Sequence, residues 1–225
     1  MQLTTIGRSV FDLFFPKRCL NCDSVLSEAN ILCVDCTLEL PFTYWNLDDS
    51  NSAYQKLSDL CSVEAACSLL IFRHDTITQK LLHALKYNNN KKVGIVLAEK
   101  LNKEMDLSVY SGIIPIPIHP KKLKKRGYNQ VIPFAKTLAD KNGIPLIDDF
   151  LIRVQNNPSQ VSKSRKERLN SIQNAFKLTS KQIKGHFLLV DDVLTSGATL
   201  SICVNLIHSQ FPEVKISVLT IASVE

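Results

Sequence analysis

Two consecutive acids followed by a hydroxyl-rich loop are the part of the sequence best suited to chemistry. An apolar segment at residues 187–190 runs directly into Asp191 and Asp192. A loop of small and hydroxylated residues comes next and leads into an expected helix: Thr195, Ser196, Gly197, Ala198 and Thr199. Backbone N–H groups and hydroxyls of such a loop can converge on one phosphate in front of the helix N-terminus. Gly197 would let the backbone approach that ligand closely.

The two acids indicate what the phosphate belongs to. Carboxylates accept hydrogen bonds from neighbouring hydroxyl groups, so the pair suits a ribose whose 5-phosphate occupies the loop. The segment lacks the Gly-x-x-x-x-Gly-Lys frame of a Walker loop. The alternative is an ordinary strand–loop–helix corner, in which Thr and Ser only cap the helix. We predict a site for phosphate and ribose at the end of this strand.

Four of the seven cysteines form a second pattern with a definite chemistry. Two Cys-x-x-Cys pairs, Cys19 with Cys22 and Cys33 with Cys36, are separated by ten residues. Each pair places two thiolates on one tight turn, and two such turns can complete a tetrahedron around Zn²⁺. Four sulfur ligands close the site, so we expect a structural zinc ion that supplies the folding free energy of a small module. A disulfide pair or a redox-active Cys-x-x-Cys is the alternative.

A dense run of positive charge lies in the middle of the chain. Five cations stand in the six positions after Pro120, and an aromatic residue with two amide neighbours follows them. Phosphate attraction combined with a stacking ring is typical of proteins that bind single-stranded nucleic acid. The alternatives are a solvated charged face and lysines that attract a phosphorylated ligand. The residues that we assign to nucleic-acid binding are Lys121, Lys122, Lys124, Lys125, Arg126 and Tyr128.

The elements that must position these residues alternate between strand and helix. Short apolar runs indicate buried strands over residues 67–72, 112–118, 187–190 and 214–221. Helical spacing of apolar residues indicates helices over residues 76–85, 93–105, 129–141 and 198–208. This alternation predicts an open, mostly parallel α/β sheet with helices on both faces. Ligands of such sheets bind beyond the carboxyl ends of the strands, which is where the two acids stand.

Composition and charge limit the other possibilities. The 225 residues are 45% apolar and 21% charged, as expected for a globular chain with one α/β domain and a small appendage. The net charge is +6, and because residues 1–50 are acidic, the basic character belongs to the rest of the chain. We find no apolar run of the roughly 18–20 residues that a membrane span needs, and no signal-peptide pattern at residues 1–15. We therefore expect a cytoplasmic protein with reduced cysteines.

The same patterns divide the chain into three segments. We expect the zinc-binding module at residues 1–45 and the α/β domain at residues 63–225. Between them, residues 46–62 begin with a polar run and lack periodicity, which indicates a linker.

The stretch with the two acids resembles the site that binds 5-phosphoribosyl-1-pyrophosphate (PRPP) in type I phosphoribosyltransferases. From about Phe14 onward the whole chain resembles the ComF/ComFC competence proteins, which join a four-cysteine zinc module to such a domain. The narrower resemblance rests on several segments, which are Lys86-Tyr87, Pro-Ile-Pro-Ile-His-Pro at 115–120, Arg-Gly-Tyr-Asn-Gln at 126–130, Gln160, Arg168, Asn170 and Ala175-Phe176. One departure is Ser196, where many relatives have Thr. The resemblance implies a type I phosphoribosyltransferase-like parallel sheet preceded by a zinc-ribbon-like module.

The resemblance also implies roles for individual residues. The PRPP-binding residues would be Lys86, Tyr87, Pro117, His119, Asp191, Asp192, Thr195, Ser196, Gly197, Ala198 and Thr199, with Mg²⁺ bound together with PRPP. In the family's fold the polar and basic region 155–171 is a mobile hood, whose closure would exclude water from the ligand. Arg168 is the hood residue expected to reach the site, and with Asp191 and Asp192 it forms the expected catalytic set. His119 as a solvated loop histidine and the hood as a disordered surface loop are the alternatives.

Two functions from different classes remain open. In the first, the protein is a PRPP-binding component of DNA uptake in natural transformation. It would then handle incoming single-stranded DNA alongside other uptake proteins such as a helicase. In the second, it is an active phosphoribosyltransferase that transfers phosphoribosyl from PRPP to an unknown nucleophile. The sequence has no recognisable pocket for a specific base, so it does not decide whether the protein is an enzyme.

Overall fold

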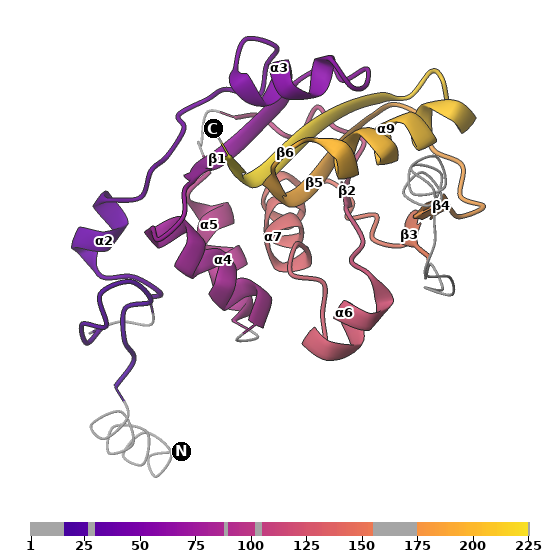
Figure 1. The fold of residues 1–225 in the computed structure, drawn as a ribbon. Helices are drawn as coiled ribbons and strands as arrows, with labels where there is room; N and C mark the ends of the chain where they lie inside the picture. Colours follow the sequence, from indigo (N-terminus) through magenta and orange to yellow (C-terminus); the bar gives the residue numbers. More distant parts are fainter. Residues whose placement is uncertain (1–15, 27–29, 88–89, 102–104, 155–174, 225) are drawn as a thin grey trace, which may run out of the picture.

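A four-stranded parallel sheet forms the centre of the protein (Figure 1). The structure is a computed structural model that describes residues 16–26, 30–87, 90–101, 105–154 and 175–224. In the spatial order β1-β6-β5-β2, the strands are Ala66–Phe72, Lys215–Val224, His186–Leu194 and Gly112–Pro115. Every neighbouring pair in this sheet is parallel, so all four carboxyl ends lie at the same edge.

The strands form because their side chains are apolar on both sides. The register places Leu189 of β5 opposite Ile114 of β2 and Val218 of β6. All three are fully buried and join one core, while Leu188 and Leu219 belong to the core on the opposite face. A sheet buried on both faces needs helices on both faces, and the chain provides them.

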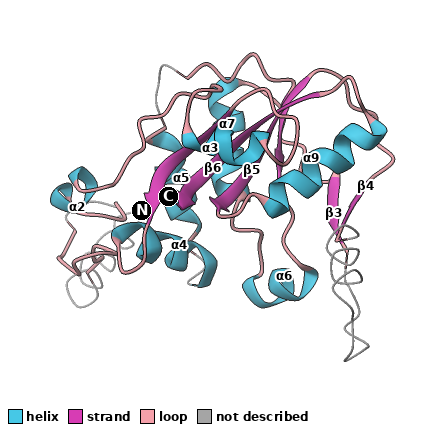
Figure 2. Cartoon of the chain, turned by 45° about the horizontal axis from the view of Figure 1, so that its top comes forward, coloured by secondary structure: helices cyan, strands magenta, loops and turns pink. Residues whose placement is uncertain are grey.

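Helices cover each face of the sheet (Figures 1 and 2). The core on the first face receives side chains from α4, α5 and α7, which span Ile77–Tyr87, Lys91–Glu99 and Ile132–Asn142. The core on the second face receives them from α3 and α9, which span Ser52–Ser58 and Ala198–Gln210. The predicted parallel α/β sheet with helices on both faces is therefore confirmed.

The four-cysteine segment packs beside this sheet rather than standing apart from it. It contains the short helix α2 (Val34–Leu38), and the Sγ of Cys33 accepts a hydrogen bond from the N–H of Cys36 at its start. Leu32 and Leu40 are buried in the same core as Leu97 of α5. Among the described residues, none of the helices has the length and apolar character that crossing a membrane requires.

The segment expected to be a linker contains structure. Residues 46–62 include α3, which begins with an N-cap at Asn51, whose side chain accepts hydrogen bonds from two helix N–H groups. Ala53 and Leu57 of this helix are fully buried in the core of the second face. The polar composition hid the helix because only these two positions face inward. The division into domains at residues 45 and 63 remains a prediction.

Other boundaries differ from the sequence prediction. The basic run forms a helix, α6 (Pro120–Arg126), that the sequence pattern did not indicate. A two-stranded antiparallel sheet of β3 (Leu151–Arg153) and β4 (Phe176–Leu178) was also not predicted. In contrast to the expected end at residue 190, β5 continues through both acids to Leu194 because its pairing with β6 continues to that point. The second predicted helix ends at Glu99, earlier than residue 105.

Candidate ligand site at the carboxyl edge of the sheet

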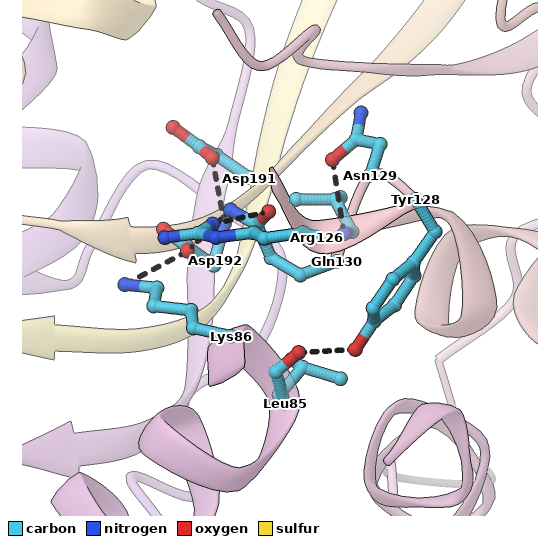
Figure 3. A network of polar contacts seen from close by, with 9 residues as sticks. Leu85, Lys86, Arg126, Tyr128, Asn129, Gln130, Asp191 and Asp192 are labelled. Carbon is cyan, nitrogen blue, oxygen red and sulfur yellow. Dashed lines mark hydrogen bonds and ion pairs between the residues drawn. The ribbon is translucent and has the colours of Figure 1, made fainter. Parts of the chain in front are cut away.

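Asp192 lies at the centre of a polar network near the carboxyl end of β5 (Figure 3). Its side chain is 12% exposed, and its Oδ2 lies 2.9 Å from the Nζ of Lys86. The same oxygen accepts a hydrogen bond of 2.9 Å from the Nε2 of Gln130. A charged group and an amide therefore hold one oxygen of this carboxylate in place, and such charge-assisted bonds are among the stronger hydrogen bonds in proteins.

The position of Lys86 follows from the packing of α4. Leu81, Leu82 and Leu85 of that helix are buried against the sheet, which directs its last turn toward the end of β5. The hydroxyl of Tyr128 donates a hydrogen bond to the backbone carbonyl of Leu85 and so connects this turn to the segment that carries Gln130. The predicted site residue Lys86 thus lies beside the predicted acid pair.

Arg126 extends the network away from the acids. Its Nη1 donates a hydrogen bond of 2.7 Å to the Oε1 of Gln130. Its guanidinium carbon lies 5.1 Å from the ring centroid of Tyr87, the residue after Lys86. The Tyr87 side chain is 57% exposed, so the guanidinium packs on an aromatic ring at the protein surface.

Asp191 is held in a different environment from Asp192. Its Oδ1 accepts a hydrogen bond of 2.8 Å from the backbone N–H of Asp192. Burial, with the neighbouring charge of Asp192 as a second cause, raises the pKa of the Asp191 carboxyl to about 8. Lys86 and Arg153 act in the opposite direction but do not outweigh burial. The Asp191 carboxyl therefore keeps its proton to a higher pH than an ordinary aspartate, and while protonated it can donate a hydrogen bond as well as accept one.

The hydroxyl-rich loop follows β5 and lines a small hollow with Asp191 at its side. Thr195 and Ser196 are exposed, and α9 begins directly after Gly197. Gly197 has a φ of +76°, and a Cβ there would lie 3.0 Å from Leu60 and 3.2 Å from Leu57. The glycine is therefore required by the backbone and by the close approach of α3 behind the loop. From the sequence we expect Gly197 only to let a ligand approach the loop, and not to make room for α3.

A second loop leaves the neighbouring strand at the same edge. The backbone N–H of Ile116, just after β2, donates to the carbonyl of Val190 at 2.8 Å, and the Nδ2 of Asn129 donates to the Ile116 carbonyl at 2.9 Å. At the end of this loop the Nδ1 of His119 accepts a hydrogen bond of 3.1 Å from the N–H of Lys121. His119 therefore caps α6. This loop carries Pro117 and His119, two of the expected PRPP-binding residues, and it and the loop 195–199 follow adjacent parallel strands.

The basic run presents its lysines on the surface of α6. The exposed cations are Lys121, Lys122, Lys124 and Lys125, whereas Arg126 is half-buried in the network described above. Tyr128 is only 8% exposed, and its hydroxyl is bound to the carbonyl of Leu85. Little of its ring is accessible to a base, so this burial disfavours the stacking role expected of Tyr128, which remains a prediction. The exposed aromatic residue next to α6 is Tyr87.

The four cysteines converge in space as well as in sequence. The Sγ atoms of Cys19, Cys22, Cys33 and Cys36 all lie within 4.8 Å of one another. Burial alone would raise the pKa of the Cys19 thiol, but hydrogen bonds from the backbone of Cys22, Cys33 and Asn21 lower it to about 6. The side-chain amide of Asn21 also donates to the Sγ of Cys36 at 3.3 Å. Four convergent sulfurs with N–H donors around them fit a metal ion such as zinc.

Some predicted residues cannot be placed, and one central residue was not predicted. Arg168 and the hood at 155–171 lie outside the described residues, as does the first third of the expected zinc module. Gln130 belongs to the Arg-Gly-Tyr-Asn-Gln segment, to which the sequence analysis assigns no role for the glutamine. Its burial and its bond to Asp192 follow from the packing of distant segments, so the sequence carries no signal for it.

The fold and the position of the site define a class of protein. A parallel α/β sheet, with an acid pair and two loops at its carboxyl edge, is a phosphoribosyltransferase-like fold, here preceded by a four-cysteine cluster. No family model matches the chain. Two similar solved structures are an orotate phosphoribosyltransferase from Aeropyrum pernix, at 15% identity, and an adenine phosphoribosyltransferase from Leishmania tarentolae, at 13%. The alignment with the orotate enzyme covers 64% of this chain and 76% of that structure, with a TM-score of 0.34. The alignment with the adenine enzyme covers 79% of this chain and 89% of that structure, with a TM-score of 0.34. The fold assignment rests on the strand order and on the positions of the two loops.

Curated relatives narrow this class. Competence protein F of Haemophilus influenzae is 28% identical over 84% of this chain and 89% of that protein. Competence protein ComFC of Streptococcus pneumoniae is 24% identical over 86% of this chain and 75% of that protein. The DNA utilization protein YhgH of Salmonella typhimurium is 27% identical, and the alignment covers 54% of this chain and 56% of that protein. The resemblance to the ComF/ComFC proteins is confirmed.

Proposed function

We propose that this protein binds PRPP with Mg²⁺ at the carboxyl edge of its sheet and takes part in DNA uptake, where it handles single-stranded DNA. The observation that carries the proposal is the acid pair Asp191–Asp192 beside the loop 195–199. Among the described residues, Lys86 and Gln130 both contact Oδ2 of Asp192, which leaves Oδ1 for a ribose hydroxyl. Asp191 would bind the second hydroxyl.

The other groups of PRPP have matching donors at this edge. The loop 195–199 supplies exposed hydroxyls and the N-terminus of α9 to the 5-phosphate. The loop 116–119, with Pro117 within it, lies at the end of the adjacent strand and would hold the pyrophosphate. Mg²⁺ would be bound by the pyrophosphate oxygens and would neutralise part of their charge. Lys86 would add a positive charge near the ribose.

DNA handling is supported by α6 and by the relatives. Four exposed lysines of α6 form a positive surface directly after the loop 116–119. Tyr87 lies beside this surface with an exposed ring, so we assign the stacking of a base to Tyr87 in place of Tyr128. The similar proteins are named for competence and for DNA utilization, which supports a role in DNA uptake.

The four-cysteine cluster has a structural role in this proposal. We assign zinc to it, because four thiolates in a closed tetrahedral set are a zinc site without an open position for substrate. Its contribution is to hold the N-terminal segment together next to α5.

PRPP binding is tested by thermal denaturation. PRPP with Mg²⁺ should raise the melting temperature, since a ligand of the native state stabilises it by mass action. Replacing both Asp191 and Asp192 with Asn should abolish this shift. A second Asp-Asp pair, Asp148 and Asp149, is exposed elsewhere on the surface and serves as a matched control. Replacing both of these residues with Asn should leave the shift in melting temperature intact. An unchanged shift in the first double variant would place the ribose at another site.

DNA binding is tested by its dependence on salt. The affinity for a labelled oligo-dT should fall with salt, with a log–log slope of about −0.7 per phosphate contacted. Replacing the four exposed lysines of α6 with Ala should flatten this slope. The control replaces four exposed lysines elsewhere, Lys177, Lys181, Lys184 and Lys215. Equal slopes in the two variants would mean that α6 is only a solvated face.

Release of pyrophosphate distinguishes this proposal from the transferase alternative. Incubation of PRPP and Mg²⁺ with single-stranded DNA or nucleobases should leave PRPP intact if the site only binds its ligand. Steady release that depends on an added acceptor, yields a phosphoribosylated acceptor and stops in the Asp191/Asp192 variant would make the protein a phosphoribosyltransferase.

A further inference from the structure

Gln130 connects the proposed PRPP site with the proposed DNA surface. Its amide nitrogen donates to Asp192, and its amide oxygen accepts from Arg126, the last residue of α6 (Figure 3). Gln130 is 5% exposed, so water does not readily replace either bond. One buried side chain therefore lies between the acid that would bind ribose and the helix that would bind phosphates of DNA.

The chemistry of its two neighbours fixes the orientation of the Gln130 amide. A guanidinium can only donate hydrogen bonds, so the amide oxygen must face Arg126. The amide NH₂ then faces Asp192, whose carboxylate accepts the bond. If Arg126 moved away, the amide would lose one of the two contacts that hold it in this orientation. It could then rotate away from the carboxylate.

Arg126 can respond to a ligand on α6. Its guanidinium packs on the exposed ring of Tyr87 and is itself only half-buried. Four lysines of the same helix precede it within a few residues, so a bound phosphate chain would lie near it. A guanidinium prefers a phosphate, with which it can form two parallel bonds, to a single amide oxygen.

We propose that Gln130 is a positioning residue that couples the two ligands: single-stranded DNA on α6 draws Arg126 away from Gln130 and so weakens PRPP binding at Asp192. The inference rests on the proposed function of both surfaces. Because coupling between two binding equilibria is reciprocal, bound PRPP must weaken DNA binding by the same factor. Typical couplings between sites correspond to about fivefold or more.

The experiment measures the dissociation constant of the complex with a fluorescent oligo-dT. Mg²⁺ is present in every sample. Each variant is measured without PRPP and again at a PRPP concentration that saturates that variant. In the unmodified protein, PRPP should raise this constant about fivefold or more. In Gln130→Met, which keeps the side-chain length but cannot make either bond, PRPP should change it less than twofold. Without PRPP the constant should be no higher than in the unmodified protein, because Arg126 no longer has a bond to Gln130 to give up when it binds DNA.

Two further variants separate coupling from other effects. Lys122→Ala with Lys125→Ala should weaken DNA binding but keep the fivefold effect of PRPP, since neither lysine contacts Gln130 in the described network. Gln130→Glu keeps the acceptor for Arg126 and loses the donor to Asp192. It should also lose the coupling, and it replaces Gln130→Met if that variant does not fold.

Each other result overturns the inference. If both ligands bind and PRPP leaves the DNA constant unchanged, the sites are independent and only the inference fails. If the fivefold effect persists in both Gln130 variants, PRPP and DNA compete directly for the lysines. If the unmodified protein binds only one ligand or neither, the proposed function fails and the inference with it.

Discussion

The Nζ of Lys86, in the last turn of α4, lies 2.9 Å from the Oδ2 of Asp192 in β5. This ion pair joins a helix on one face of the sheet to the strand that carries the acid pair. The Lys86 side chain is 26% exposed, so water reaches the pair and reduces its contribution to stability. Its main effect is to fix the position and charge of the carboxylate.

Lys86→Met should therefore weaken PRPP binding more than it weakens the fold. The loss of one charge-assisted hydrogen bond, about 1.5 kcal/mol, corresponds to about a tenfold increase in the dissociation constant for PRPP. Titration calorimetry with PRPP and Mg²⁺ measures it. Lys136→Met is the matched control, because Lys136 pairs with Asp140 at an exposed position of α7. Equal PRPP affinities in the two variants would show that Lys86 has no part in the site.

Gly197→Ala tests whether α3 supports the phosphate loop. Alanine there must adopt a φ of +76°, and its Cβ would press against Leu57 and Leu60. We expect a loss of about 2 kcal/mol of unfolding free energy, together with the loss of PRPP binding. In Gly143→Ala the φ of +64° is similar but no atom lies within 4 Å of the new Cβ. That control should lose only about 1 kcal/mol and bind PRPP normally, and urea denaturation with PRPP titration compares the two.

Tyr128→Leu tests the reassignment of the aromatic residue, because it removes the ring as well as the hydroxyl. The loss of buried volume and of the hydrogen bond to the carbonyl of Leu85 should cost about 2 kcal/mol of stability. Oligo-dT affinity should not change, because Tyr128 is only 8% exposed. Tyr87→Ala should have the opposite profile, with DNA binding weakened by about 1–3 kcal/mol and stability nearly unchanged. If Tyr128→Leu alone reduced DNA affinity, the original assignment would be restored.

Features of the site that depend on neighbouring residues in the sequence could be predicted, whereas features that depend on contacts between distant segments could not. The strands and the acid pair were found because a continuous apolar run followed by two acids is visible in the sequence alone. The helix α6 was missed because Leu123 is its only apolar interior residue and is 45% exposed, so there was no helical period. Its signals are local instead: Pro120 at the first position, the cap from His119, and Gly127 with φ of +77° at its end.

Other features depend on contacts between distant segments. The burial of Tyr128 follows from where α4 packs, and the bond between Gln130 and Asp192 follows from the position of β5 relative to α7. No pattern around these residues contains that information. The same holds for α3, whose Leu57 is buried in the core of the second face and lies beside the loop at Gly197.

The zinc assignment predicts one metal ion per chain. Cys33→Ser should abolish zinc binding, because removal of one of four thiolates opens the site. Cys61→Ser is the matched control, since Cys61 is buried outside the cluster and its thiol donates to the carbonyl of Leu57. Elemental analysis of protein purified without chelator should give about one zinc for the control. An unmodified protein without zinc would contradict the assignment.

The raised pKa of Asp191 predicts how stability depends on pH. An ordinary aspartate in the unfolded chain has a pKa of about 4, whereas burial raises the pKa of Asp191 to about 8 in the folded protein. Between these values the folded state binds the proton more tightly, so the contribution of Asp191 to stability is full below pH 4. It is lost progressively as the pH rises to about 8.

Asp191→Asn should therefore stabilise the protein relative to the unmodified chain, and increasingly so from pH 5 to pH 8. At pH 8 the gain should be at least about 1 kcal/mol, since one unit of pKa corresponds to about 1.4 kcal/mol. Urea denaturation at pH 5, 6.5 and 8 without ligand measures it. In Asp149→Asn the effect should be the same at all three pH values, because Lys181 lowers the pKa of that exposed carboxyl and it is ionised in both the folded and the unfolded state above pH 5. A gain that is the same at all three pH values would mean that Asp191 is ionised in the folded protein, and that its burial does not keep the proton in place.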